Sequence, residues 1–218
     1  MNMKIKICIS SHIKSYEKTY SILVDSLIKS GVPPEDIYFF IGGYDKYENI
    51  SKDGINIYTV PHNSMDLTNI ISVIDLDLES DYWFAIHDTC YVGEDFYSKL
   101  ISYNITTDTV LLTGPGVSMN MGSYKYTYLL SIRDRLLNYK NKSNLPDDIL
   151  KLKISLIRNE DIFLKDKGVV YNSSPHVTTQ LDDNIYGTET ERILQYFPDI
   201  DFYKLKANWG QDTNTLEL

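Results

Sequence analysis

The chain has 218 residues and a formal net charge of −9. Its length is sufficient to bury a sizeable core and suits one α/β domain. The negative charge argues against binding to duplex nucleic acid, which normally needs a basic surface, and no apolar run approaches the roughly 18 to 20 residues that cross a bilayer. We therefore expect a soluble protein without a membrane span or a nucleic-acid partner.

The first residues pass directly into an alternating strand pattern and show no signal-peptide pattern, so a cytoplasmic location is expected. The two cysteines, Cys8 and Cys90, lie far apart, and each is in or directly after an apolar run. Buried free thiols are predicted here in preference to a disulfide or a metal site.

Strands and helices alternate in the first half of the chain. Strands are predicted at 4–9, 37–41, 55–60, 82–86 and 109–113, and helices at about 16–28, at 66–74 and from 94 onward. The first of these helices is stopped by Ser30 and Gly31 and then by two prolines. This alternation indicates a mainly parallel sheet with helices on both faces and with ligands at the carboxyl ends of the strands.

Apolar stripes at helical spacing predict which side chains the helices bury. The stripe of the first helix comprises Tyr16, Tyr20, Leu23, Val24, Leu27 and Ile28, and that of the helix after residue 94 comprises Phe96, Leu100 and Ile101. The second half of the chain is less regular. Helices are predicted at 126–139, at 146–159 and at 189–197, the last stopped by Pro198, and a final strand is predicted at 201–207. Without a repeat or a clear linker, we expect a single domain over 1–218.

The apolar run at 82–86 stops abruptly at His87, Asp88 and Thr89. A buried strand that ends in a lone carboxylate and an imidazole is a suitable place for chemistry. An aspartate in this position is about as often a turn former or a helix cap, and a single histidine is more often structural. Both interpretations stay open on the pattern alone.

Polar residues also follow the other predicted strands. They are Ser10, Ser11, His12, Tyr44, Asp45 and Asn63. Because the carboxyl ends of parallel strands meet at one edge, these residues are expected to build a crevice with His87 and Asp88. Such a row suits a nucleotide, with the early loops bonding to base and ribose and a carboxylate-held cation binding the diphosphate. Gly42 and Gly43 would permit close approach of a ligand, although paired glycines are more often only a turn.

Several common motifs are absent or misplaced. The sequence has no G-x-G-x-x-G, no P-loop and no G-x-S-x-G elbow. Asp75-Leu76-Asp77 matches a D-x-D pattern, but it precedes the buried strand instead of following it. We therefore expect these two carboxylates to face solvent near a helix terminus.

The order strand, helix, strand, strand, helix, and then an apolar strand with an acidic end resembles the nucleotide-sugar glycosyltransferases of the GT-A fold. Residues 86–93, Ile-His-Asp-Thr-Cys-Tyr-Val-Gly, followed by Phe96, are similar to the D-x-D region of that family and to the helix start after it. The likeness is to small bacterial and viral members, including those of large DNA viruses that glycosylate their own capsid protein. It covers residues 3 to about 115 well and the remainder loosely.

The resemblance implies a GT-A-like, Rossmann-like sheet in which 1–115 bind the nucleotide sugar and 116–218 form the acceptor side. The implied reaction transfers a sugar from a nucleoside-diphosphate sugar, with UDP favoured, to a hydroxyl of a glycan or glycoprotein. Asp88 would be the carboxylate for Mn²⁺ or Mg²⁺, and the strand-end residues above would line the nucleotide pocket. A standard D-x-D has two carboxylates, whereas Ile86 and Cys90 stand two residues from Asp88. Weak or absent metal dependence is therefore allowed, and His87 could add a nitrogen ligand.

An inverting transferase needs a carboxylate that accepts the proton of the acceptor hydroxyl, and inversion is slightly favoured here. Asp212 is the first candidate, because neighbouring Trp209 could form a sugar platform, although a tryptophan here is about as often simple core packing. Glu189 and Glu191 are the next candidates, although acidic residues at a helix start commonly compensate the helix dipole. Two cationic side chains could face the diphosphate, Arg192 and Lys206, and either could equally be a surface charge.

Two other functions stay open. A sugar nucleotidyltransferase has the same fold class but normally carries a glycine-rich, basic loop after the first strand, and residues 10–14 contain no glycine. A non-catalytic module that binds a nucleotide or a sugar is made credible by the single carboxylate at the motif. Turnover of a donor would separate an enzyme from such a module.

Overall fold

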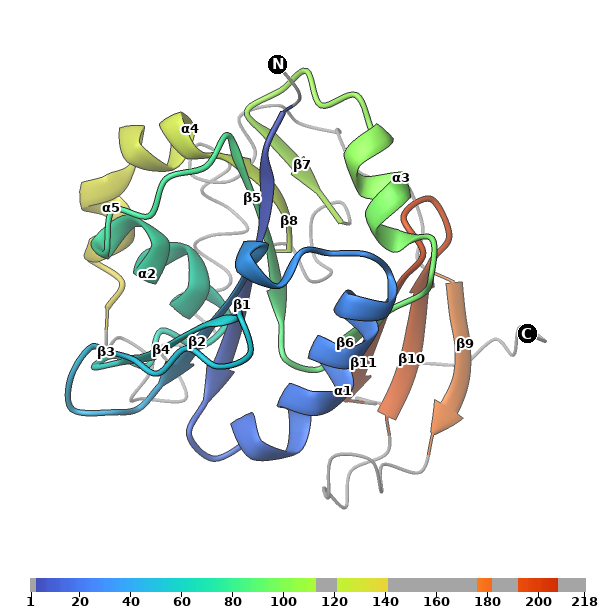
Figure 1. Cartoon of the computed structure of the whole chain (residues 1–218), viewed down its shortest axis with the longest axis horizontal. Coiled ribbons are helices and arrows are strands. Elements are labelled where there is room, and N and C mark those ends of the chain that lie inside the picture. The colour runs from blue at the N-terminus through green and yellow to red at the C-terminus, as the bar shows by residue number, and fades with distance from the viewer. Residues whose placement is uncertain (1–2, 113–120, 141–175, 182–191, 208–218) are drawn as a thin grey trace.

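The computed structural model describes residues 3–112, 121–140, 176–181 and 192–207. The larger sheet contains β1 (Ile5–His12), β2 (Ile37–Gly42), β3 (Glu48–Asn49), β4 (Asn56–Val60), β5 (Tyr82–His87), β7 (Thr109–Leu111) and β8 (Gly122–Lys125). The smaller sheet contains β6 (Cys90–Val92), β9 (His176–Leu181), β10 (Arg192–Phe197) and β11 (Phe202–Ala207). The helices are α1 (Tyr16–Lys29), α2 (Thr68–Asp75), α3 (Phe96–Ser102), α4 (Tyr126–Ser131) and α5 (Arg133–Leu137). The fold is therefore mixed α/β (Figure 1).

The large sheet has the order β3-β4-β2-β1-β5-β8-β7. Its centre is parallel, because β1 pairs with β2 and β5, and β2 pairs with β4, all in the same direction. The prediction of a mainly parallel sheet is confirmed for these four strands. The edges are antiparallel, since β3 runs against β4 and β8 runs against both β5 and β7. The central strands are long apolar runs because helices or the small sheet cover both of their faces.

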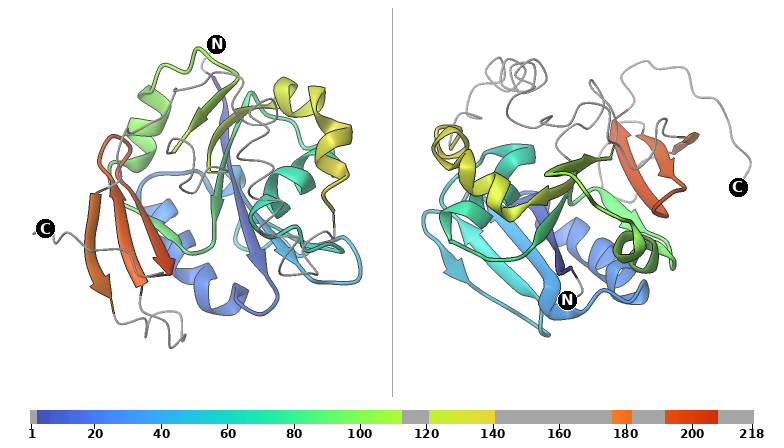
Figure 2. Two further views of the ribbon diagram at one scale, coloured as in Figure 1. Left: turned by 180° about the vertical axis from the view of Figure 1, so that it is seen from behind. Right: turned by 90° about the horizontal axis from the view of Figure 1, so that it is seen from above.

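Two layers enclose the large sheet (Figures 1 and 2). Helices α1 and α3 and the small sheet pack on one face, and helices α2, α4 and α5 pack on the other. Strand β1 serves both layers, because Ile7 and Ile9 face the α1 layer whereas Cys8 faces the α2 layer. Alternate residues of a strand point to opposite faces. The same alternation continues through the polar end of β1, where it decides which residues can meet.

The helix stripes are confirmed except at their edges. Leu23, Leu27, Phe96 and Leu100 are buried, as predicted. Ile28 and Ile101 were predicted on the same stripes, and this is wrong, because they are 40% and 51% exposed. Each follows a buried leucine by one residue, and one residue rotates the side chain by about 100° around a helix. The helix predicted at 126–139 is interrupted at Ile132, where α4 ends and α5 begins.

The short helix predicted at 189–197 is wrong over its described part. Residues Arg192–Phe197 form strand β10, which pairs antiparallel with β11. Pro198 begins the tight turn between these strands instead of stopping a helix. In this turn Asp201 adopts a φ of 51°. The apolar and aromatic residues of this segment suit either structure, and pairing with β11 selected the strand. The predicted last strand, at 201–207, is confirmed.

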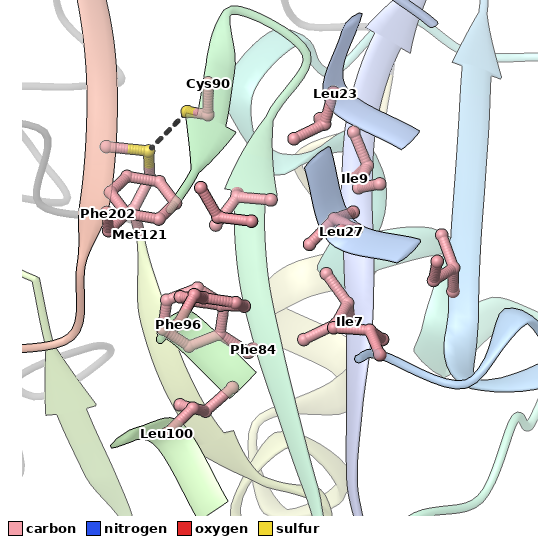
Figure 3. Close-up of a cluster of buried hydrophobic side chains, with 14 of the residues drawn as sticks. Ile7, Ile9, Leu23, Leu27, Phe84, Cys90, Phe96, Leu100, Met121 and Phe202 are labelled. Carbon is pink, nitrogen blue, oxygen red and sulfur yellow. Dashed lines mark hydrogen bonds between the residues drawn. The ribbon is translucent and has the colours of Figure 1, made fainter. Parts of the chain in front are cut away.

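The small sheet is built by both halves of the chain. Strand β6 pairs with β11, so the segment directly after the central strand β5 joins the C-terminal strands. Phe202 of β11 enters the core, where its ring centroid lies 6.0 Å from that of Phe84 and 6.1 Å from that of Phe96 (Figure 3). The sequence predicted a loop and then a helix at this point. Strand β6 was not expected, because a strand of only three residues carries little pattern.

Both cysteines are buried and free, as predicted. Cys90 lies next to Met121, with 3.9 Å between the sulfur atoms (Figure 3). Burial raises the pKa of the Cys90 thiol to about 11, so this thiol stays protonated at neutral pH and is a poor nucleophile. Among the helices of the described ranges, none has both the length and the apolar character that crossing a membrane requires.

Candidate functional site

The strand order creates a crossover at the centre of the large sheet. From β1 the chain proceeds through β2 to β4 on one side, and β5 then pairs with β1 on the other side. In open α/β sheets, ligands bind outside the carboxyl ends of the strands where the order reverses in this way. Here that point lies between the ends of β1 and β5, where Ser10 is opposite His87. The candidate site is the polar edge around this pair.

Asp88 follows β5 and turns towards the α1 layer. Its Oδ2 atom accepts hydrogen bonds from the hydroxyls of Ser11 (2.7 Å), Ser15 (2.9 Å) and Thr19 (3.1 Å). The residue is only 9% exposed. Three donors from β1 and from the beginning of α1 therefore compensate the carboxylate and fasten the end of β5 to that layer. Ser11 and Asp88, which the sequence analysis placed together, do lie together.

Ser10 points to the opposite face. Its hydroxyl donates to the carbonyl of Asp66 at 3.3 Å and accepts from the amide N–H of Asn69 at 2.9 Å. The Asn69 side chain in turn donates to the carbonyls of Cys8 and Ile86, on β1 and β5. Ser10 and Asn69 thus hold the beginning of α2 over the crossover. The predicted crevice is divided between two faces, because Ser10 and Asp88 lie on opposite sides of the sheet.

The loops after β1, β2 and β4 meet at the same edge. The amide of Gly43 donates to the carbonyl of His62, and the imidazole of His12 lies against Gly43. Gly42 has no room for a side chain, since an added Cβ would lie 2.8 Å from the carbonyl oxygen of His62, and Gly43 has a φ of 92°, which favours glycine. The two glycines therefore allow the loops to pack against each other, and Asn63 adjoins them.

Three predicted nucleotide contacts lie at the rim of this edge. The side chains of Tyr44 and Asp45 are exposed, and His12 is half-buried. Burial and the positive charge of Lys14 lower the pKa of His12, which favours a neutral imidazole at neutral pH.

His62, which the sequence analysis did not select, is a buried structural histidine. Its ring nitrogens lie 3.0 Å from the hydroxyl of Ser64 and 3.2 Å from that of Ser72. Burial, and secondly the charge of Lys140, lower the pKa of His62 to about 4, against the opposing effect of Asp75. The imidazole is therefore neutral at neutral pH and joins the loop after β4 to helix α2.

The replacement His62→Gln is expected to make the free energy of unfolding depend less on pH in the acidic range. An imidazole in the unfolded chain has a pKa of about 6.5, so between roughly pH 6.5 and 4 the unfolded state binds more protons than the folded state. The contribution of His62 to the free energy of unfolding is complete above this window and decreases by about 3 kcal/mol as the pH falls through it. Urea unfolding of both proteins at about pH 7, 5.5 and 4.5 measures the difference. Parallel curves for the two proteins would contradict this role.

A buried lysine that the sequence analysis missed lies at the tip of β5. The Nζ atom of Lys204, on β11, is 3.2 Å from Nδ1 of His87 and also donates to the hydroxyl of Thr89. An ammonium group can only donate, so Nδ1 of His87 accepts and the imidazole proton resides on Nε2. Nε2 lies 3.8 Å from the carboxylate of Asp66. Asp66, His87 and Lys204 form a polar row, which we call the crossover row.

Residue type and the two-residue period of a strand could not predict that Lys204 is buried. In the predicted strand at 201–207, Phe202 and Lys204 share one face and Tyr203 and Leu205 share the other. The second face is the more apolar one, so the pattern by itself favours burying Tyr203. Phe202 instead packs against the main core, and Lys204, which is on the same face of the strand, is buried with it.

The predicted catalytic residues lie outside the described residues. This applies to Asp212, Glu189 and Glu191, and to Trp209 as a sugar platform.

Of the rejected D-x-D pair, Asp77 is exposed, as expected, and pairs with Arg133. The expectation that Asp75 faces solvent is wrong, because its carboxylate accepts hydrogen bonds from Tyr47 and Lys140. Lys140 and Tyr47 come from segments far away in the sequence, so no local pattern predicts these contacts.

The described side chains bring few ligands for a divalent cation together. Within the described ranges, no three His, Cys, Asp or Glu side chains gather to hold a metal ion. Three hydroxyl groups already donate to Oδ2 of Asp88, and Nδ1 of His87 accepts from an ammonium group. Mg²⁺ and Mn²⁺ prefer several unprotonated oxygen ligands without a competing positive charge.

None of the models of known protein families matches this chain, and no curated protein matches it either. The fold and the site therefore define the class of protein. It is a mixed α/β protein whose large, mostly parallel central sheet is compatible with a Rossmann-like fold, and a polar row stands where the strand order of this sheet reverses.

Proposed function

We propose that the chain is a glycosyltransferase with a GT-A-like fold that moves a sugar from a nucleoside-diphosphate sugar to a hydroxyl acceptor. The observation that carries the proposal is the crossover row, which puts a buried ammonium group, an imidazole and a carboxylate at the ligand-binding edge of a Rossmann-like sheet. A nucleoside-diphosphate sugar needs these kinds of group, because it combines two phosphates with several hydroxyls.

The order of the strands supports the proposal. Strands β4, β2, β1 and β5 lie in the order 3-2-1-4, with which the strand order of a doubly wound dinucleotide-binding sheet begins. They also appear along the chain in the order on which the GT-A resemblance depends. The antiparallel β8 next to β5 departs from a purely parallel nucleotide-binding sheet. One side of the β5 tip is therefore formed by other elements, namely β6 and β11.

The chemistry of the edge matches the parts of the donor. The carboxylate of Asp66, 26% exposed, could accept hydrogen bonds from ribose hydroxyls, as acidic residues do in dinucleotide-binding folds. His12, Tyr44 and Asn63 at the rim could contact the base. In the transfer, the bond from the anomeric carbon to the diphosphate breaks while the acceptor oxygen bonds to that carbon, so negative charge grows on the leaving diphosphate. A positive group at the β5 tip would stabilise it.

The test is turnover of a donor panel. We expect the protein, incubated with UDP-, GDP- and dTDP-sugars, to release free nucleoside diphosphate slowly from one of them, with UDP-sugars favoured. Chromatography of the nucleotides measures this release, and the assay is run with Mn²⁺, with Mg²⁺ and with a chelator. Asp66→Asn should reduce the affinity for the preferred nucleotide by about tenfold, since a hydrogen bond to a charged group contributes about 1.5 to 3 kcal/mol.

Asp77→Asn is the matched control, because Asp77 is exposed and lies in the turn after α2. It should leave the affinity unchanged. Binding of a nucleotide sugar without any release of diphosphate would favour the non-catalytic binding module. Release of pyrophosphate from a nucleoside triphosphate and a sugar phosphate would favour the nucleotidyltransferase. Absence of both binding and turnover across the panel contradicts the proposal.

A further inference from the structure

The positive charge of Lys204 is buried without a negative partner in the described part of the chain. The residue is 6% exposed, and its ammonium group contacts Nδ1 of His87 and the hydroxyl of Thr89. No carboxylate among the described residues forms an ion pair with it. Burying an ammonium group is costly unless a counter-charge compensates it. A bound anion would supply that charge.

A second unsatisfied group lies beside this lysine. Gln195 on β10 is directly opposite Lys204 on β11, and both side chains are buried. Directly opposite residues of an antiparallel pair point to the same face of the sheet. Within the described residues, Oε1 of Gln195 has no hydrogen-bond partner. Buried side-chain oxygens are rarely left without a donor, so the group points to a hydroxyl that a ligand would bring.

We propose that Lys204 is the diphosphate-binding cation of this protein, and that a nucleoside diphosphate binds here without a divalent metal ion. This inference rests on the proposed function and deepens it. Lys204 binds the diphosphate oxygens, and Gln195 accepts a hydrogen bond from a hydroxyl of the sugar. Solvent reaches the row at Asp66 and His87, which are partly exposed, so the ligand enters from that side.

The inference accounts for the single carboxylate at the motif. In a metal-dependent site, two carboxylates hold a cation against the phosphates. Here Oδ2 of the one carboxylate, Asp88, accepts from three hydroxyls on the α1 side of the sheet. The ammonium group of Lys204 comes instead from β11, held at the tip of β5 by the pairing of Lys204 with Cys90. A fixed positive side chain replaces the function of the ion.

The experiment measures the affinity of the whole chain for UDP, GDP, dTDP and inorganic pyrophosphate by calorimetry, in a chelator and in Mn²⁺. The wild type should bind one nucleoside diphosphate in the chelator. Lys204→Met should weaken this binding by about 30-fold or more, because loss of one member of a buried charged pair costs about 2 to 5 kcal/mol. Lys204→Arg, which keeps the charge, should lose less. Lys46→Met, at an exposed lysine after β2, should change nothing.

Thermal unfolding of the ligand-free proteins separates this role from a structural one. If Lys204 awaits an anion, Lys204→Met removes an uncompensated buried charge, and the melting temperature is not lowered. A lowered melting temperature together with unchanged affinity would show a structural lysine and overturn the inference. Binding that requires Mn²⁺ and is unaffected by Lys204→Met would also overturn it, while the proposed function would stand.

Binding of pyrophosphate distinguishes a failure of the Lys204 anion site from a failure of the proposed function. Lys204-dependent binding of pyrophosphate without binding of any nucleoside diphosphate would support the anion site and contradict the nucleotide-sugar function. Failure of pyrophosphate and of every nucleotide to bind, in the chelator and in Mn²⁺ alike, overturns both.

Discussion

Replacing Asp88 with alanine is expected to lower the free energy of unfolding by about 3 kcal/mol. The change removes the acceptor of three hydroxyl groups, and two of the donors, Ser11 and Thr19, are buried. A buried polar group without a partner costs about 1 to 3 kcal/mol. For a chain of this size, the loss corresponds to a decrease in melting temperature of roughly 6 to 12 °C. Urea and thermal unfolding would measure it.

Asp45→Ala provides the matched control. Asp45 also follows a strand at the same edge and was also predicted to contact the nucleotide, but it is exposed. Its replacement should change the unfolding free energy by no more than about 0.5 kcal/mol. If Asp88→Ala left stability intact but abolished a Mn²⁺ dependence of donor turnover, Asp88 would be a metal ligand and the structural role described here would be wrong.

Replacing Phe202 with alanine is expected to lower the free energy of unfolding by about 4 kcal/mol. Its ring is fully buried next to Phe84 and Phe96 (Figure 3), and it also contacts the ring of Phe197. Loss of a large aromatic side chain from a core removes its burial and leaves a cavity, at a cost of about 3 to 5 kcal/mol. The measurement is the midpoint of urea unfolding, with the slope checked for two-state behaviour.

Ile101→Ala is the control for Phe202→Ala. The helical stripe predicts that Ile101 is buried, whereas the structure leaves it 51% exposed. Its replacement should change stability by less than about 1 kcal/mol. Equal effects of the two replacements would contradict the docking of β11 on the main core. Because Lys204 is two residues from Phe202, Phe202→Ala should also weaken any ligand bound at the crossover row.

The crossover row depends on the contact between the two sheets. His87 comes from the large sheet and Lys204 from the small one, and the two meet only because β6 leaves β5 to pair with β11. Asp66 comes from the short 3-10 helix Met65–Leu67 before α2, which Ser10 and Asn69 hold in place. Each member therefore depends on a different contact, and the row exists only in the folded chain.

Local patterns predicted much of the first half of the chain. The parallel strands, helix α1 and the buried cysteines follow from apolar runs, from helical spacing and from the glycine and prolines after the helix. These signals extend over only a few residues, so they can be recognised in the sequence without the tertiary structure. The end of β5 was also recognised as the polar centre of the fold, because an apolar strand that stops at His87 and Asp88 is visible without any partner.

The tertiary structure decided which of these polar residues face each other. Ser10 and Asp88 are both at the crossover, yet the alternation of β1 and the turn after β5 send them to opposite faces. The segment that ends at Phe197 suited a helix or a strand, and pairing with β11 made it a strand. Lys204 was hidden because its burial follows from Phe202 entering a core built by residues more than one hundred positions away. Short-range sequence patterns determine elements, whereas faces, partners and buried charges are set by long-range packing.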